Sequence, residues 1–204
     1  MASASDAEAR FWAAAERGTS FFMGNADVQR ALGALAQRLE DLSVPYAIAG
    51  AMALNAYGYE RFTSDVDVLL TSDGLAAFKA AWLGRGYIEK FPGSRGLRDT
   101  EHNVAIDVLL AGAFPGDGKP KPVRFPDPDE SWVERHVRLL PVEKLVELKL
   151  ASGLSAPHRL RDLADVLELI RHASLPRDLG DALDPSVRPK YAELWQAAQT
   201  VDPE

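Results

Sequence analysis

Residues 46–70 read YAIAGAMALNAYGYERFTSDVDVLL, and this stretch decides how the chain folds. Its first residues are apolar up to Gly50 and predict a short strand over 46–49. Small residues follow and predict a helix over about 51–56, after which a turn leads into a second strand that begins at Asp65. The stretch therefore predicts a strand, a short helix and a second strand in immediate succession.

The second strand begins with Asp65-Val66-Asp67. Residues two apart in a strand point to the same side, so the two carboxylates share one face while Val66 and Val68 share the other. Two adjacent carboxylates repel each other and resist joint ionisation unless a cation lies between them. Because Mg²⁺ is a hard ion that prefers oxygen ligands, the pair predicts a site for Mg²⁺, with Mn²⁺ as the alternative ion.

The tetrapeptide DVLL occurs twice in the chain, at 67–70 and at 107–110. The second copy ends an apolar segment that predicts a strand over 103–110. If the two strands are neighbours, Asp107 brings a third carboxylate to the edge of the sheet that carries the first two. The repeat therefore predicts a cluster of three acids assembled from distant parts of the chain.

The composition is that of an ordinary globular protein, with 204 residues, 47% hydrophobic and 26% charged. This length fits one domain or a domain with a helical annex. The net charge of −7 disfavours a general nucleic-acid binder, and the absence of cysteine excludes disulfides and thiolate sites. No apolar run approaches the roughly 20 residues of a membrane span, and the N-terminus does not resemble a signal peptide. We expect a cytoplasmic protein with no membrane partner.

The remaining periodicity predicts helices around the strands and a helical C-terminal segment. Helices are expected over 7–16, 27–42, 75–83, 142–151, 157–173 and 188–198, and further strands over 87–91 and 132–140. Residues 112–129 are rich in Pro and Gly and predict a long loop. We expect an α+β (α/β-like) fold with an N-terminal helical extension (1–26), a core with a small mixed β-sheet flanked by helices (27–140) and a C-terminal helical segment packed on the core (141–204).

Residues around the first two acids are candidates for contact with an anion. Gly50 and Ala51 lie where strand becomes helix, so free backbone N–H groups and the helix dipole could cradle phosphate. The alternative is a tight turn that needs glycine for backbone freedom. Arg61 and Thr63 precede the acids and could contact phosphate or only decorate a loop.

Lys149 is unusual because it falls in the middle of the apolar arc of the helix predicted over 142–151. Asp162 lies on the margin of the apolar face of the next helix. An unpaired buried charge costs several kcal/mol, so a lysine that points to a core needs a partner. Lys149 and Asp162 could form a structural ion pair, or Lys149 could reach a bound triphosphate.

These motifs together resemble known enzymes. The first set resembles the minimal nucleotidyltransferases of the DNA polymerase β superfamily: Gly50-Ala51-x-Ala53-Leu54, Arg61-x-Thr63-x-Asp65-x-Asp67 and Ile106-Asp107-Val108. The second set is similar to abortive-infection and type IV toxin–antitoxin nucleotidyltransferases: Leu145-x3-Lys149-Leu150 followed by Arg161-Asp162-Leu163-x-Asp165-Val166. One departure is Ala51, where many relatives have Gly or Ser, so a serine hydroxyl to the phosphates is missing.

The resemblance implies two-metal nucleotidyl transfer from a nucleoside triphosphate (NTP) on a nucleotidyltransferase core. Asp65 and Asp67 would hold both Mg²⁺ ions, and Asp107 would ligate the ion that activates the acceptor. Pyrophosphate would leave toward Gly50 and Ala51, with Arg61 or Lys149 as the accompanying cation, and Thr63 is a further candidate contact for the nucleotide phosphates. The acceptor hydroxyl could belong to RNA, a protein or a small molecule, although the acidic net charge disfavours a long nucleic acid. A toxin-type role would add an antitoxin or toxin protein as partner.

Two other interpretations compete with this one. Phosphatases and glycosyltransferases also use Asp-x-Asp, but there the acids typically follow the apolar strand, whereas here they precede Val68–Leu70. The stronger competitor is a catalytically inactive nucleotidyltransferase-like protein that acts as a binding partner, antitoxin or scaffold. All three acids are present, and a decayed site is expected to have lost one.

Overall fold

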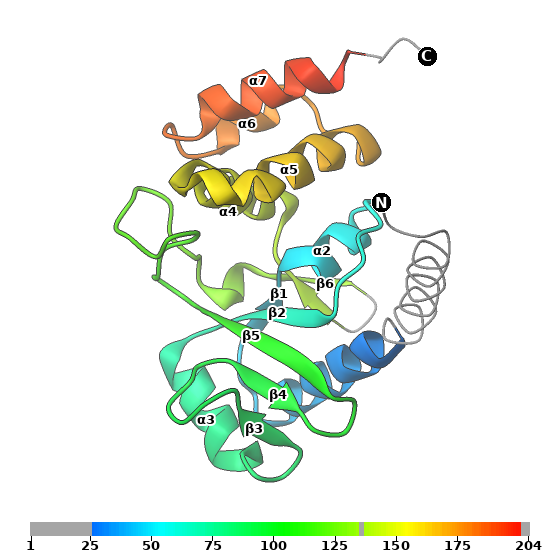
Figure 1. The fold of residues 1–204 in the computed structure, drawn as a ribbon, viewed down its shortest axis with the longest axis vertical. Helices are drawn as coiled ribbons and strands as arrows, with labels where there is room; N and C mark the ends of the chain where they lie inside the picture. The colour runs from blue at the N-terminus through cyan, green and yellow to red at the C-terminus, as the bar shows by residue number, and fades with distance from the viewer. Residues whose placement is uncertain (1–25, 135–136, 201–204) are drawn as a thin grey trace, which may run out of the picture.

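A seven-stranded sheet lies at the centre of the structure, a computed structural model that describes residues 26–134 and 137–200. The helix predicted over 7–16 lies outside these residues. The strands are β1 (Tyr46–Ile48), β2 (Asp65–Leu70), β3 (Tyr87–Glu89), β4 (Leu97–Asp99), β5 (Val104–Leu110), β6 (Trp132–Glu134) and β7 (Val137–Leu139). The helices are residues 26–41, α2 (Gly50–Ala56), α3 (Ser72–Trp82), α4 (Val142–Ser155), α5 (Leu160–His172), α6 (Leu179–Ala182) and α7 (Arg188–Ala198) (Figure 1). In both described ranges, no helix has the length and apolarity needed to cross a membrane.

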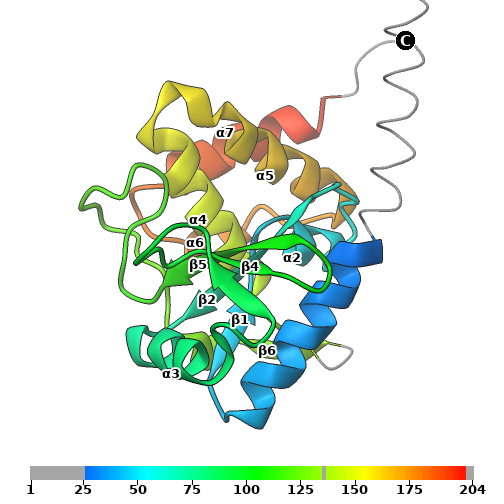
Figure 2. The ribbon, with the colours of Figure 1, turned by 60° about the horizontal axis from the view of Figure 1, so that its bottom comes forward.

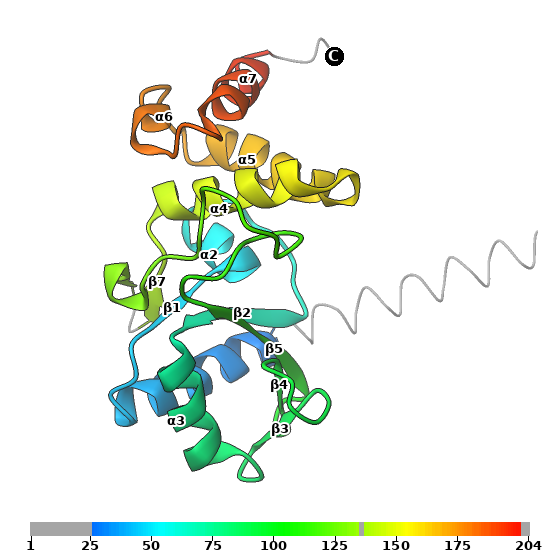
Figure 3. The ribbon, with the colours of Figure 1, turned by 90° about the vertical axis from the view of Figure 1, so that its left-hand side faces the viewer.

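The sheet is mixed, with the strand order β3-β4-β5-β2-β1-β7-β6. At its centre β2 pairs parallel with β5 on one side and antiparallel with β1 on the other. Figure 3 shows the sheet edge-on, with the helix of residues 26–41 and α3 on one side and α2 and the C-terminal helices on the other. The predicted α+β fold, a small mixed sheet flanked by helices with a helical C-terminal segment, is confirmed.

Three details of the fold differ from the sequence prediction. The strand predicted over 132–140 is two short strands: β6 and β7 pair antiparallel, with Trp132 opposite Leu139. Alternation of side chains predicts extended backbone but cannot locate a reversal of direction within it. The strand β4 and the helix α6 were not predicted, because elements of three and four residues are too short to produce a periodic pattern.

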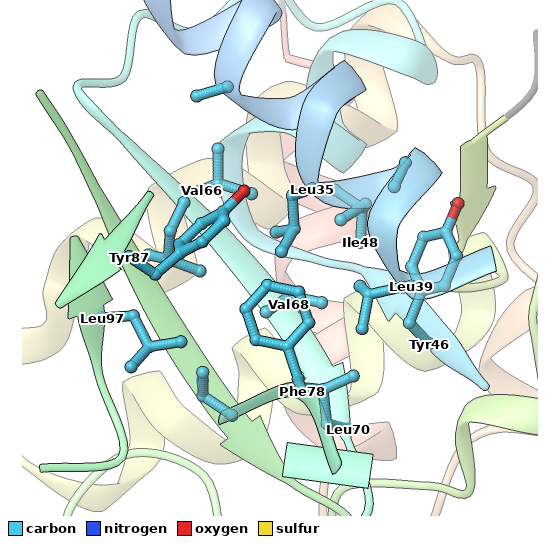
Figure 4. Close-up of a cluster of buried hydrophobic side chains, with 14 of the residues drawn as sticks. Leu35, Leu39, Tyr46, Ile48, Val66, Val68, Leu70, Phe78, Tyr87 and Leu97 are labelled. Carbon is cyan, nitrogen blue, oxygen red and sulfur yellow. The ribbon is translucent and has the colours of Figure 1, made fainter. Parts of the chain in front are cut away.

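One face of the sheet packs against the helix of residues 26–41 and against α3. Alternate residues of β2 reach this face, namely Val66, Val68 and Leu70, and all are at most 1% exposed. Leu35 and Phe78 come from the two covering helices and meet them in the close-up of this core (Figure 4). The two helices lie next to each other along the sheet in the view of Figure 2. This core holds β2 in place through the side chains of Val66, Val68 and Leu70.

The opposite face of the sheet is covered by α2 and α4, while α5 packs on α4 and α7 packs on α5. Leu69 of β2 belongs to this second core, together with Leu54 of α2, Val146 of α4 and Val166 of α5. Because side chains alternate along a strand, Asp65 and Asp67 point to the same side as Leu69. The acids therefore lie on the face that the C-terminal helices cover.

Truncation of the first core tests this arrangement. Leu35 is 1% exposed, so Leu35→Ala leaves a cavity, and we expect it to lower the free energy of unfolding by about 2–5 kcal/mol. Leu160→Ala is the matched control, because Leu160 is also a helical leucine but is 67% exposed. Urea denaturation followed by circular dichroism measures both. Equal losses for the two variants would contradict the assignment of Leu35 to the core.

Candidate active site

The parallel pairing of β2 with β5 brings two of the candidate acids side by side. Asp67 and Asp107 are direct partners in this pairing, and Asp65 is the partner of Ala105 two residues earlier. All three acids therefore lie on one face of two adjacent central strands. Each is partly exposed.

Gly50 makes close contact with the middle acid. Its backbone φ is +57°, and a Cβ atom at this position would lie 1.8 Å from Asp67 Oδ2. The N–H of Ala49 also donates a hydrogen bond to the carbonyl oxygen of Asp67, at 3.0 Å. Glycine is thus required for two reasons, the left-handed turn and the space that the Asp67 carboxylate occupies. Ala51 is buried in α2 and its methyl group offers no hydrogen bond.

Electrostatics around Asp67 show that the acids interact. Burial, and then the neighbouring carboxylates of Asp65 and Asp107, raise the pKa of Asp67 from the ordinary 3.8 to about 6. The nearby cations Lys149 and Arg61 act in the opposite direction but do not offset this. Repulsion of this kind is what a bound divalent cation relieves, so the oxygen donor set fits Mg²⁺.

Two of the acids are engaged by neighbouring side chains. The hydroxyl of Thr63 donates to Asp65 Oδ1, and the ammonium of Lys90 donates to Asp107 Oδ1. Within residues 26–134 and 137–200, no three His, Asp or Glu side chains form a ready metal site. Sequence analysis missed Lys90, because its contact with Asp107 depends on the pairing of β3, β4 and β5, which no local pattern reveals.

A buried ion-pair network lies on the same side of the sheet as the acids. Lys149, 8% exposed, donates to Asp165 Oδ2 at 2.7 Å and to Asp162 Oδ1 at 3.2 Å. Arg61 Nη1 donates to the same Asp165 oxygen at 2.5 Å. The structure thus forms the pair considered from the sequence, Lys149 with Asp162, but gives Lys149 a closer and more buried partner. Asp165 follows Asp162 by three residues on α5, a spacing that places both on one helix face and could have revealed it.

Two pockets border the acids, and each is lined by one cation of this network. The first lies between the sheet, α4 and the loop of residues 112–126, and its lining includes Gly50, Asp67, Arg95 and Lys149. The lining residues that remain are largely apolar, among them Leu109, Phe114, Phe125, Leu145 and Leu148. The second pocket is polar and is lined by residues 59–65 and by Arg161. The acids therefore have accessible space on two sides.

The contact between Gly50 and Asp67 predicts a specific stability loss. Gly50→Ala should lower the free energy of unfolding by about 1–2 kcal/mol for the left-handed backbone and by about 1–3 kcal/mol more for the overlap with the carboxylate. Gly84→Ala is the control, because Gly84 has a φ of +75° and open space around its Cβ position. In an Asp67→Gly background, which removes both the carboxylate and the Cβ atom 2.9 Å away, the extra loss should largely disappear. Equal losses at Gly50 and Gly84 by urea denaturation would argue against the contact.

The raised pKa of Asp67 predicts how the metal-free protein responds to pH. Between pH 4 and pH 6 the folded state binds more protons at this group than the unfolded state, so its contribution to stability is full below pH 4 and is lost as pH rises to about 6. A change from 3.8 to about 6 corresponds to at most about 3 kcal/mol. Asp67→Asn should therefore match wild type near pH 4 and exceed its stability by up to that amount at pH 7. Denaturation curves recorded in EDTA from pH 4 to pH 7 check this prediction. A stability difference between wild type and Asp67→Asn that does not change with pH would refute it.

Comparisons with known proteins address the fold. The sequence matches no protein family and no curated protein at a significant level. Among solved structures, JHP933 from Helicobacter pylori is 17% identical over 86% of this chain and 90% of its own, with a TM-score of 0.47. ANT(2'')-Ia in complex with adenylyl-2''-tobramycin is 13% identical over 79% of this chain and 92% of its own, with a TM-score of 0.48.

A third structure carries the conclusion about the fold. An antigenic nucleotidyltransferase-like protein from Paracoccidioides brasiliensis is 16% identical over 84% of this chain and 88% of its own, with a TM-score of 0.50. The chain is thus similar to a nucleotidyltransferase-like protein over most of both lengths, and it has a nucleotidyltransferase-like fold.

Proposed function

We propose that this protein is an Mg²⁺-dependent nucleotidyltransferase that moves a nucleoside monophosphate from an NTP to an acceptor hydroxyl. The single observation that carries the proposal is the register of β2 and β5, in which Asp67 lies opposite Asp107 with Asp65 on the same face. This register occurs in a nucleotidyltransferase-like fold and beside two accessible pockets. Three carboxylates on one sheet face favour chemistry on a phosphate group that is handled with divalent cations.

The acids would divide the work as the motif resemblance implies. Asp65, Asp67 and Asp107 would hold Mg²⁺, with Mn²⁺ as an alternative. When bound, the ions would supply positive charge to the attacking and leaving oxygens of the displacement. Rotation of the Asp65 and Asp107 side chains away from Thr63 and Lys90 would free their oxygens for this role.

The transfer itself is an in-line displacement at the α-phosphate. The acceptor oxygen forms a bond to the α-phosphorus, the bond from that phosphorus to the bridging oxygen breaks, and pyrophosphate leaves. Asp107 is the candidate to take the proton of the acceptor hydroxyl, as the motif resemblance implies, and 43% of its side chain is accessible to an acceptor.

Cations near the acids would stabilise the negative charge of the triphosphate and of the departing pyrophosphate. Lys149 lines the first pocket with Gly50 and Asp67, and Arg61 lines the second pocket with Asp65. Both are held by Asp165, so their positions change little when a ligand enters. Gly50 and Ala51 would contribute backbone N–H groups rather than side chains.

The acceptor and the biological role rest on the motifs alone. RNA, a protein and a small molecule remain the three acceptor classes, and the net charge of −7 weighs against a long nucleic acid. The similarity of the segment from Leu145 to Val166 to abortive-infection and type IV toxin–antitoxin enzymes supports a toxin-type role. A protein partner, an antitoxin, would accompany that role.

A second candidate function is binding without catalysis. The observation that favours it is that Asp65 and Asp107 both have side-chain partners and that no ready metal site exists in residues 26–134 and 137–200. An inactive nucleotidyltransferase-like protein would keep the fold and a nucleotide pocket but would not transfer the nucleotide. Nucleotide binding and nucleotide transfer must therefore be measured separately.

Label transfer separates the two candidates. The protein is incubated with each α-labelled NTP and Mg²⁺, with and without cell extract, and labelled products are resolved on gels and by thin-layer chromatography. We expect transfer that needs Mg²⁺ and falls at least about 100-fold in the double variant Asp65→Asn, Asp67→Asn. The double variant Asp178→Asn, Asp181→Asn changes two exposed carboxylates on and next to α6 and should retain transfer.

The outcomes point to different conclusions. Equilibrium binding of NTP without transfer, in every extract tested, would support the second candidate function. Transfer that survives removal of both Asp65 and Asp67 would remove the acids from the mechanism. Neither binding nor transfer would argue against both functions.

A further inference from the structure

Lys90 forms an ion pair with Asp107, one of the three candidate metal ligands. It follows β3 directly, and its ammonium donates to Asp107 Oδ1 on β5, two strands away in the sheet. Its side chain is 31% exposed and that of Asp107 is 43% exposed. The contact therefore lies at the accessible side of the acid cluster, where an incoming cation would approach.

The side chain of Lys90 reaches Asp107 across the neighbouring strand region at Gly96. A Cβ atom on Gly96 would lie 3.1 Å from Lys90 Cδ and 3.4 Å from Cε, so the absence of a side chain at Gly96 leaves room for the lysine stem. The N–H of Lys90 also donates to the carbonyl oxygen of Gly96, at 3.1 Å. The stem thus lies over Gly96 on its way to Asp107.

The turn that carries Lys90 is held at its base. Lys79 of α3 donates to Glu89 Oε1 and to the carbonyl oxygen of Ser94, both at 2.6 Å. Glu89 also accepts a hydrogen bond from the N–H of Gly93, at 2.8 Å. Because the turn is fixed on both sides of Lys90, the lysine has a defined position from which only its side chain needs to move.

We infer that Lys90 is a resident counter-cation for Asp107, which holds this carboxylate while no divalent cation is bound and is displaced when one binds. The inference rests on the proposed function, since it assigns Asp107 to the metal site. It explains why a cluster of three acids tolerates the metal-free state. Lys90 is in this sense a positioning residue that sets how tightly the site binds its cation.

The physical consequence is that Lys90 and a divalent cation compete for the Asp107 carboxylate. A divalent cation that binds Asp107 must break the ion pair and must also approach the positive charge of the displaced lysine, and both effects weaken its binding. Removal of the lysine charge should therefore tighten divalent binding, by about tenfold, which corresponds to about 1.4 kcal/mol. Replacement of Lys90 by arginine keeps the charge and should leave binding close to that of wild type.

Calorimetric titration of Mn²⁺ and Mg²⁺ into EDTA-treated and then dialysed protein tests the inference. Lys90→Met is compared with wild type, with Lys90→Arg, and with Lys190→Met as a matched control. Lys190 also forms an ion pair with a carboxylate, Glu193, but on α7 and away from the acids. We expect about tenfold tighter binding for Lys90→Met alone.

A second readout separates this role from a merely structural one. Thermal unfolding is recorded in EDTA and in Mg²⁺ for wild type and Lys90→Met. Competition predicts that Mg²⁺ stabilises the variant more than it stabilises wild type. A structural role predicts that the midpoint falls equally under both conditions, and that result would overturn the inference.

The calorimetric outcomes also distinguish the inference from the proposed function. If wild type and Lys90→Met bind the cations equally well, or if the variant binds more weakly, Lys90 does not compete and only this inference is overturned. If neither protein binds a divalent cation, the metal-dependent function is overturned together with it.

Discussion

Repulsion among like charges on one sheet face is the constraint around which this structure is arranged. The parallel register of β2 and β5 fixes Asp67 opposite Asp107, and the alternation of β2 adds Asp65 to the same face. The raised pKa of Asp67, caused first by burial and then by these two neighbours, is the direct result. A sheet selected only for stability would avoid such a cluster, and this is the physical reason for proposing a cationic ligand there.

The buried ion pairs of Asp165 with Arg61 and Lys149 also place charges next to the acids. Buried ion pairs add little net stability, because the desolvation of the charges offsets their attraction. What the network does achieve is position: one carboxylate of α5 holds Arg61, from the loop before β2, and Lys149, from α4. Segments far apart in the sequence thus deliver two cations to fixed places beside Asp67. The C-terminal helices are therefore part of the site and not only a cover for the sheet.

Much of the sheet could be predicted from the sequence, because β1, β2 and β5 carry strong local patterns. The DVLL repeat suggested that Asp107 joins the other acids if its strand lies beside theirs, and the structure supplies the pairing and the register. The contacts of Lys90 and Asp165 could not be predicted in this way. They depend on which strands become neighbours and how α5 lies on α4, and neither follows from periodicity. For the same reason the reversal between β6 and β7 was missed.

The buried ion pairs of Asp165 and the exposed ion pair of Lys90 with Asp107 differ in how much free energy their loss costs. Loss of one partner from the Asp165 network would leave an uncompensated charge at a side chain only 3% exposed, which typically costs about 3–5 kcal/mol. An exposed pair such as Lys90 with Asp107 is typically worth only about 0.2–1 kcal/mol. Displacement of Lys90 from Asp107 should therefore cost less than displacement of Arg61 or Lys149 from Asp165. The candidate site thus combines two cations held by a buried carboxylate with one acid whose partner is exposed, an arrangement compatible with the nucleotidyl transfer that we propose.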